Sequence, residues 1–269
     1  MRRPHLTNTL TPHGFQPKES PITGGVLKVV AIIQARMGST RLPGKVLLDL
    51  AGESMLARVV NRVRRARLIN ELLVATTDRA ADDAIVAECR KWSVPVSRGD
   101  QDDVLDRYFR AAQLAKAEVV VRITSDCPLI DPEIADKTVG AFLEARPDYA
   151  SNRIVQTYPR GLDTEVLTFD ALARVWQAAR KPYERTHVTP YIYEHPAEFR
   201  ILSVTGDADY SNHRWTIDTP EDLEFVRAIY ARLTDKPEFL WRDVLEVLDR
   251  EPELMELNRF VMQKALHEG

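Results

Sequence analysis

Residues 29–50, VVAIIQARMGSTRLPGKVLLDL, decide the fold of this chain. The apolar run from Val29 to Ile33 is typical of a buried parallel strand. The loop that follows suits a polyphosphate, because glycine lets backbone N–H groups approach and arginine offers forked donors. Since α/β proteins place ligands directly after such strands, we favour a phosphate-binding loop over a basic surface loop. The loop residues concerned are Arg36, Gly38, Ser39, Arg41, Gly44 and Lys45.

The loop differs from a Walker A motif. Five residues separate Gly38 from Gly44, whereas that motif needs about four. Val46 stands where the motif places its magnesium-binding Ser or Thr. A G-x-G-x-x-G dinucleotide fingerprint is also absent from the loop. The sequence therefore argues against a P-loop ATPase or kinase.

Composition limits the class of protein. The chain has 269 residues, 44% hydrophobic and 29% charged, which is ordinary for one soluble globular domain, with or without an embedded subdomain. A net charge of −3 gives no support for a nucleic-acid or membrane-surface partner. No apolar run approaches the roughly 18–20 residues that span a bilayer. The two cysteines, Cys89 and Cys127, lack C-x-x-C spacing and fit a reduced cytoplasmic protein without structural zinc.

The order of apolar runs and amphipathic segments predicts the fold class. Buried strands are expected at 72–75, 94–96 and 118–123, between helices at 54–68, 80–92, 102–116 and from 131 onward. This alternation predicts βαβ units and a mainly parallel sheet, hence an α/β fold. The predicted organisation is a disordered leader at 1–27, a nucleotide-binding core at 28–148, an inserted smaller lobe at 149–212, and a return to the core with C-terminal helices at 213–269.

Two acids stand directly after strong apolar runs. Asp126 follows the run at 118–123, and Asp218 closes the run at 215–217. Parallel strands direct their C-terminal ends at the ligand crevice, where Mg²⁺ takes a few carboxylates together with phosphate oxygens and water. Each acid has a structural alternative, the capping of a loop or of the next helix. The two lie too far apart in sequence for one local capping motif, so we favour a shared Mg²⁺ site.

The string Gln34–Lys45 resembles the signature of nucleotidylyltransferases that attach CMP to acidic sugars such as sialic acid and Kdo, with Gln34 where those relatives usually have Pro. Ser125–Leu129 and Asp218–Leu223 resemble two further strings of these enzymes. The chain is most similar to the spore-coat polysaccharide cytidylyltransferase-like group, often called SpsF-like, over about residues 28–258. The resemblance implies a three-layer, Rossmann-like nucleotide-diphospho-sugar transferase fold with an inserted lobe, in a cytoplasmic homodimer.

The same resemblance implies transfer of CMP from CTP to an acidic sugar, a sugar phosphate or a phosphonate-like acceptor, with release of pyrophosphate, for surface polysaccharide or glycan precursors. The implied partners are CTP and a small acidic acceptor, without nucleic acid or membrane, and the implied cofactor is Mg²⁺ on Asp126 and Asp218. The catalytic residues would be Arg36, Lys45, Asp126 and Asp218. The nucleotide-binding residues would be Gln34, Ala35, Arg36, Gly38, Ser39, Arg41, Lys45, Thr77, Asp78, Arg98 and Asp126. The acceptor-binding residues would be Tyr158, Arg160, Asp163, Glu165, His187, Asn212 and Arg214.

Other functions stay open at the level of sequence. A glycosyltransferase of related fold would use a D-x-D metal motif, and the chain has one at Asp207–Asp209 in a polar turn. A non-catalytic nucleotide sensor would have no need of both acids. A guanylyl- or uridylyltransferase is a nearer alternative, because the loop specifies the triphosphate better than the base.

Overall fold

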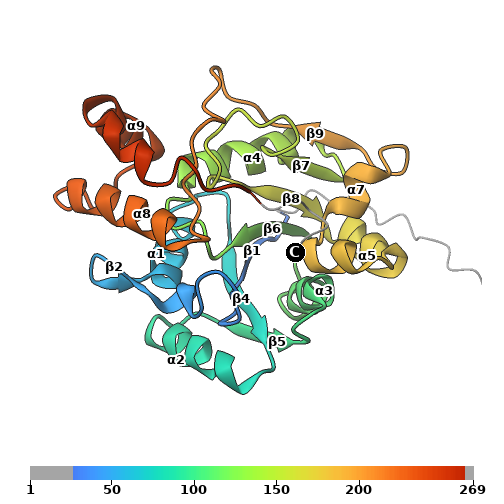
Figure 1. Ribbon diagram of the computed structural model, residues 1–269. Helices are drawn as coiled ribbons and strands as arrows, with labels where there is room; N and C mark the ends of the chain where they lie inside the picture. Colours follow the sequence, from blue (N-terminus) through green and yellow to red (C-terminus); the bar gives the residue numbers. More distant parts are fainter. Residues whose placement is uncertain (1–26, 264–269) are drawn as a thin grey trace, which may run out of the picture.

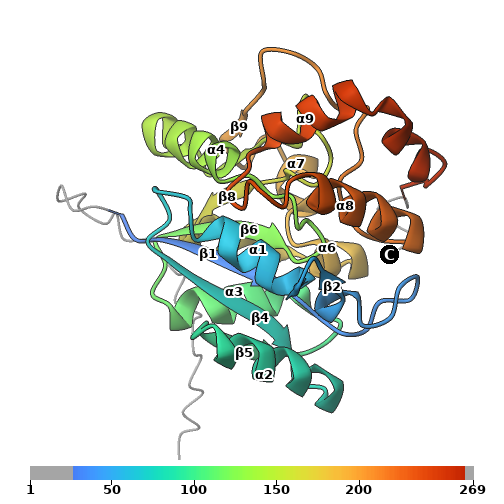
Figure 2. The ribbon, with the colours of Figure 1, turned by 90° about the vertical axis from the view of Figure 1, so that its left-hand side faces the viewer.

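The computed structural model describes residues 27–263. A seven-stranded sheet of order β5-β4-β1-β6-β8-β7-β9 forms the middle layer, and helices cover both of its faces (Figures 1 and 2). The strands are β1 (Val29–Gln34), β4 (Glu71–Thr77), β5 (Val96–Gly99), β6 (Val119–Thr124), β7 (Tyr149–Ser151), β8 (Glu165–Thr168) and β9 (Ile201–Ser203), with β2 (Asp49–Leu50) and β3 (Glu53–Ser54) as a separate pair. The helices are α1 (Met55–Val63), α2 (Asp83–Lys91), α3 (Val104–Leu114), α4 (Pro132–Ala145), α5 (Phe169–Ala178), α6 (Pro182–His187), α7 (Pro190–Glu194), α8 (Pro220–Arg232) and α9 (Trp241–Arg250), with 3₁₀ turns η1 (Lys45–Leu47), η2 (Ala80–Asp82) and η3 (Pro252–Leu257).

The first strand is apolar on both sides because helices cover both faces of the sheet. Val29, Ala31 and Ile33 pack in the cluster that includes residues of α1, α2, α4, α8 and α9. Val30 and Ile32 point the other way, into the cluster with α3, α5 and α7. Each of these five side chains is at most 2% exposed. The continuous apolar run is therefore that of a central strand, as the sequence predicted.

Two helices begin at side chains that cap their first turns. The Asp131 carboxylate accepts hydrogen bonds from the amides of Glu133 and Ile134, at the start of α4. At α8, the Thr219 hydroxyl and the Asp222 carboxylate form a reciprocal capping box. These bonds satisfy amides that have no partner inside the first turn. The predicted α/β fold with a mainly parallel sheet is confirmed, since β1 pairs in parallel with β4 and β6, and β4 with β5.

Residues 149–212, predicted as an inserted lobe, do not form a sheet of their own. β8 pairs antiparallel with β6, from Val119↔Thr168 to Arg122↔Glu165. β7 then lies between β8 and β9. The segment therefore continues the central sheet and covers the β6 edge that would otherwise stay open. The predicted leader at 1–27 lies outside the described residues except for Leu27, and 264–269 lie outside them as well.

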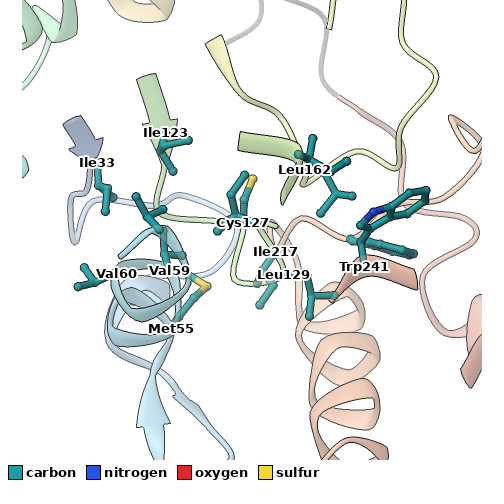
Figure 3. Packing of buried hydrophobic residues seen from close by; sticks show 14 of the residues in the cluster. Ile33, Met55, Val59, Val60, Ile123, Cys127, Leu129, Leu162, Ile217 and Trp241 are labelled. Carbon is teal, nitrogen blue, oxygen red and sulfur yellow. The ribbon is translucent and has the colours of Figure 1, made fainter. Parts of the chain in front are cut away.

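Segments distant in sequence meet in one apolar layer beside the carboxyl ends of β1 and β6. Cys127, Leu162, Ile217 and Trp241 belong to this layer (Figure 3). Both cysteines of the chain are free and buried. Within residues 27–263, no helix has the length and apolar character needed to cross a membrane.

Candidate active site

The sheet has a switch point between β1 and β6. From β1 the chain moves to β4 and β5 on one side and then crosses to β6 on the other side. The register Gln34↔Thr124 brings the last residues of β1 and β6 together. In open α/β sheets, ligands bind in the crevice outside the carboxyl ends of the strands at such a point. The loops after Gln34 and after Thr124 therefore define the candidate site.

The loop after β1 is folded back on itself. The Met37 carbonyl accepts hydrogen bonds from the amides of Ser39 (2.9 Å) and Gly44 (3.0 Å). Gly44 has φ +70°, in the left-handed region that favours glycine. Gly38 is exposed, and a Cβ added there would meet nothing within 4 Å. Arg36 is also exposed, and its side chain makes no hydrogen bond or ion pair in the described part of the chain.

The centre of the site is Lys45, which ends this loop and begins η1. Its Nζ donates to Asp218 Oδ1 (2.9 Å), Asp126 Oδ2 (3.2 Å) and the Ile217 carbonyl (2.6 Å). Burial lowers the pKa of Lys45, but the two carboxylates outweigh burial and raise it. Burial raises the pKa of Asp126, and the Lys45 ammonium, with hydrogen bonds from neighbours, offsets that and holds the pKa below its usual range. Lys45 is therefore a charged group that ties the two predicted metal ligands together.

Asp218 is surrounded by cations. Its Oδ2 lies 3.0 Å from Arg41 and 3.0 Å from Arg214, in addition to the Lys45 contact at Oδ1. Arg214, predicted to bind the acceptor, also forms an ion pair with Asp222 (2.8 Å). Most of the Arg214 donors are thus used within the protein. This geometry favours a role for Arg214 in fixing Asp218.

The donor set around Asp126 and Asp218 fits a hard divalent cation. Both residues offer carboxylate oxygens. They are two ligands only, since residues 27–263 contain no cluster of three or more His, Cys, Asp or Glu side chains able to hold a metal. Mg²⁺ and similar ions accept such a site, because one or two carboxylates suffice when phosphate oxygens and water complete the shell.

Two predicted acceptor residues border this centre. The Arg160 backbone pairs with the 213–215 segment, accepting from the Trp215 amide (2.7 Å), and its half-buried side chain has no hydrogen bond or ion pair in the described residues. Asp163 has no hydrogen bond there either, and its nearest cation is Arg153 at 3.8 Å. Burial raises the pKa of Asp163, Arg153 and Arg160 oppose that effect, and the charge of Asp126 adds to it. An available cation and an available acid thus lie beside Asp126.

Other predicted acceptor residues lie elsewhere or are already engaged. Glu165 is 2% exposed and bound by Arg122, by the Tyr149 hydroxyl (2.7 Å) and by the Thr189 hydroxyl (2.6 Å), which favours a structural role. Tyr158 is buried and accepts from Lys137 Nζ (2.9 Å), beside a pocket of about 350 Å³ between α4 and α9. Asn212 is exposed in the turn before Arg214, and His187 is half-buried at the end of α6.

The residues predicted to bind the nucleotide differ in their exposure and in the hydrogen bonds that they already make within the protein. Gln34 accepts from Arg122 (3.1 Å), and Ala35 is buried with its amide on the Ala75 carbonyl. Thr77 is buried, whereas Asp78 is exposed at the end of β4. Arg98 donates to the Thr77 carbonyl (2.8 Å) and to Asp83 (2.6 Å), so its guanidinium holds the β4–α2 connection in place.

Asp82 is a site residue that the sequence analysis missed. It is 1% exposed, and its carboxylate accepts from the Met37 amide (2.8 Å), the Thr76 hydroxyl (3.1 Å) and the Thr77 amide (3.2 Å). It therefore ties the phosphate loop to the end of β4. Its neighbour Asp83 is exposed, and nothing in the local sequence distinguishes the two acids.

The D-x-D motif at Asp207–Asp209 lies in an exposed loop, where Asp209 accepts from the Ser211 amide (2.9 Å).

Comparisons with known proteins identify the family of this chain. A family model described as Cytidylyltransferase matches residues 30–264. The spore coat polysaccharide biosynthesis protein SpsF of Bacillus subtilis is 35% identical over 84% of this chain and 95% of its own length. A 3-deoxy-manno-octulosonate cytidylyltransferase of Anaeromyxobacter dehalogenans is 32% identical over 76% of this chain and 98% of its own. The solved structure of a cytidylyltransferase from Leptospira borgpetersenii matches with a TM-score of 0.83 at 35% identity, covering 88% of this chain and 100% of that one. The chain therefore belongs to the cytidylyltransferase family and is similar to its SpsF-like members.

Proposed function

We propose that this cytidylyltransferase transfers CMP from CTP to a hydroxyl group of a small acidic sugar and releases pyrophosphate, in the synthesis of a surface polysaccharide or glycan precursor. One observation carries the proposal: the carboxylates of Asp126 and Asp218 meet on Lys45 at the switch point of the sheet, directly after the phosphate loop. Nucleotidyl transfer needs this combination of phosphate binding and charge neutralisation.

On the nucleotide side, the folded loop after β1 would receive the triphosphate. The exposed Gly38 leaves room for phosphate oxygens, and the Arg36 guanidinium, unpaired within residues 27–263, supplies forked donors. Mg²⁺ would be held by Asp126 and Asp218, where it would neutralise charge on the phosphates. Arg41 and Arg214 would keep Asp218 oriented from its other oxygen.

On the acceptor side, Arg160 and Asp163 suit different groups of one substrate. The Arg160 guanidinium would bind the carboxylate of an acidic sugar. Asp163, with its raised pKa, would accept the proton of the attacking hydroxyl. That oxygen bonds to the α-phosphorus as the bond from the α-phosphorus to the bridging oxygen breaks, and pyrophosphate leaves. The names of the two relatives, one acting in spore coat polysaccharide synthesis and one on 3-deoxy-manno-octulosonate, support a sugar of this class.

We also propose that the protein works as a cytoplasmic homodimer, which rests on the family resemblance alone. The sequence alternatives have less support. A glycosyltransferase would draw on Asp207 and Asp209, which are exposed in a loop. A guanylyl- or uridylyltransferase is opposed by the family model that matches residues 30–264.

Pyrophosphate release tests the proposal. The enzyme with Mg²⁺ is assayed with CTP, UTP, GTP and ATP, each against acidic sugars, sugar phosphates and phosphonates. We expect release with CTP and an acidic sugar. Release only with a sugar phosphate or phosphonate would exclude the proposed role of Asp163, and preference for another nucleotide would contradict the proposal itself.

A pair of arginine variants tests the acceptor side. Arg160→Met should raise KM for the acidic sugar and leave KM for CTP nearly unchanged, because the Arg160 side chain has no hydrogen bond or ion pair to lose within residues 27–263. Arg200→Met is the matched control. Arg200 is exposed, directly precedes β9, and forms an ion pair with Asp148 (3.2 Å). Equal effects of the two substitutions would argue against acceptor binding by Arg160.

A further inference from the structure

The ammonium group of Lys45 is surrounded by oxygen atoms, as a metal ion would be. An ammonium group has three N–H donors, and all three find an acceptor here: Asp126, Asp218 and the carbonyl of Ile217, within 2.6–3.2 Å. Lys45 is 9% exposed. Its side chain therefore points inward, to the two acids, in this structure.

All four oxygens of the two carboxylates are engaged by the chain itself. Asp126 uses Oδ2 for Lys45 and Oδ1 for the Cys127 thiol (3.5 Å). Asp218 uses Oδ1 for Lys45 and Oδ2 for two arginines. A divalent cation needs oxygens at about 2.0–2.1 Å, so it cannot bind between these oxygens while Nζ holds the same position. A positive charge already placed there also repels a second one.

We propose that the Lys45 ammonium competes with the divalent metal for Asp126 and Asp218, so that metal binds tightly only together with the triphosphate. This inference rests on the proposed function of the same site. The incoming phosphates offer Lys45 an alternative set of anionic partners, because Lys45 begins η1 at the end of the phosphate loop. The exchange releases the two carboxylates for the metal. Lys45 thereby acts as a positioning residue that couples metal binding to nucleotide binding.

Binding of Mn²⁺ without nucleotide tests this coupling. Free Mn²⁺ is followed by electron paramagnetic resonance during titration of the wild type and of Lys45→Met, which keeps the length of the side chain and removes its charge. We expect Lys45→Met to bind Mn²⁺ at least about tenfold more tightly, since a competing cation is lost. Lys236→Met is the matched control. It removes a lysine that pairs with Asp243 (2.5 Å) and should leave Mn²⁺ affinity unchanged.

The outcomes separate the two proposals. Unchanged or weaker Mn²⁺ affinity in folded Lys45→Met overturns the competition. If Lys45→Met does not fold alone, its folding on addition of millimolar Mn²⁺ supports the inference, and failure to fold with Mn²⁺ rejects it. Pyrophosphate release by the wild type is measured in parallel. An active wild type without tighter Mn²⁺ binding by the variant rejects only the competition. Tighter binding with a wild type inactive on every acidic sugar rejects only the proposed acceptor.

Discussion

Gly161→Ala tests how the two halves of the site are joined. Gly161 has φ +109°, and a Cβ there would lie 2.7 Å from the Trp215 carbonyl carbon and 2.9 Å from the Thr216 nitrogen. Both contacts are to backbone, so no flexible side chain can move aside. The backbone that would have to shift leads directly to Asp218.

The expected magnitude has two parts. A left-handed conformation costs an alanine about 1–2 kcal/mol, and overpacking of a tight contact adds about 1–3 kcal/mol. Together they should lower the free energy of unfolding by about 3 kcal/mol and Tm by about 10 °C for a domain of this size. Thr216 Oγ1 and the Ile217 amide both bond to the Asp126 carbonyl (3.1 and 2.8 Å). The shift should therefore displace both acids and slow pyrophosphate release by about tenfold to a hundredfold.

Gly52→Ala is the matched control. Gly52 also has positive φ (+88°), yet an added Cβ meets nothing within 4 Å. Only the conformational part of the cost applies, about 1–2 kcal/mol, and turnover should be unchanged. Tm is measured by calorimetry and turnover at 20 °C, where both variants are folded. If Gly161→Ala is no less stable and no less active than Gly52→Ala, the close approach of the two segments does not hold the site together.

Three further predictions concern single carboxylates. Glu165→Gln leaves Arg122 buried without its counter-ion and should destabilise the protein at pH 7 by about 3–5 kcal/mol. Burial favours the protonated form of Glu165, but Arg122 and Arg153 outweigh it and lower the pKa of Glu165 to about 2. The stabilisation by ionised Glu165 is therefore present above about pH 4.5 and lost as the pH falls toward 2. Urea unfolding should show a difference in unfolding free energy between wild type and variant that becomes smaller in acid. A difference that does not depend on pH would count against an ionised Glu165. Asp82→Ala releases the Met37 amide and should raise the Kd for CTP in calorimetric titrations, whereas an unchanged Kd would show that the loop holds its shape without this bond. Asp126→Ala should reduce pyrophosphate release by at least about 10²–10³-fold, and near-wild-type turnover would remove Asp126 from the mechanism.

The sequence predicted those parts of the site whose position follows from where a strand ends. Val29–Ile33 identifies the central strand, and the βαβ order then predicts that Asp126 lies near the loop after that strand. The pairing of Lys45 with Asp126 and Asp218 was not predictable, because its partners lie 81 and 173 residues away in sequence. The sequence instead placed Lys45 with the nucleotide, because it belongs to the phosphate loop.

Glu165 shows a second limit of sequence reasoning. It belongs to a polar string next to Asp163, so the family resemblance grouped both as acceptor residues. The antiparallel pairing of β8 with β6 places Arg122 opposite Glu165, and a buried arginine needs a nearby anion. Asp163, two residues earlier, precedes β8, has no partner strand opposite it, and makes no hydrogen bond in the described residues beyond its 3.8 Å ion pair with Arg153. Which acid is structural and which is available depends on the register of the sheet.

The charges of the site suggest how a nucleotide enters it. Three acids and three cations are paired within the protein, namely Asp126, Asp218 and Asp222 with Lys45, Arg41 and Arg214. A balanced cluster attracts a distant triphosphate only weakly, because opposite charges at short range cancel each other's field. Arg36 is unpaired within residues 27–263 and, unlike the half-buried Arg160, is exposed, so it supplies an uncompensated charge that an incoming phosphate meets first. Arg36→Met should therefore slow CTP association and reduce its dependence on salt, whereas loss of Lys45 should act on metal affinity.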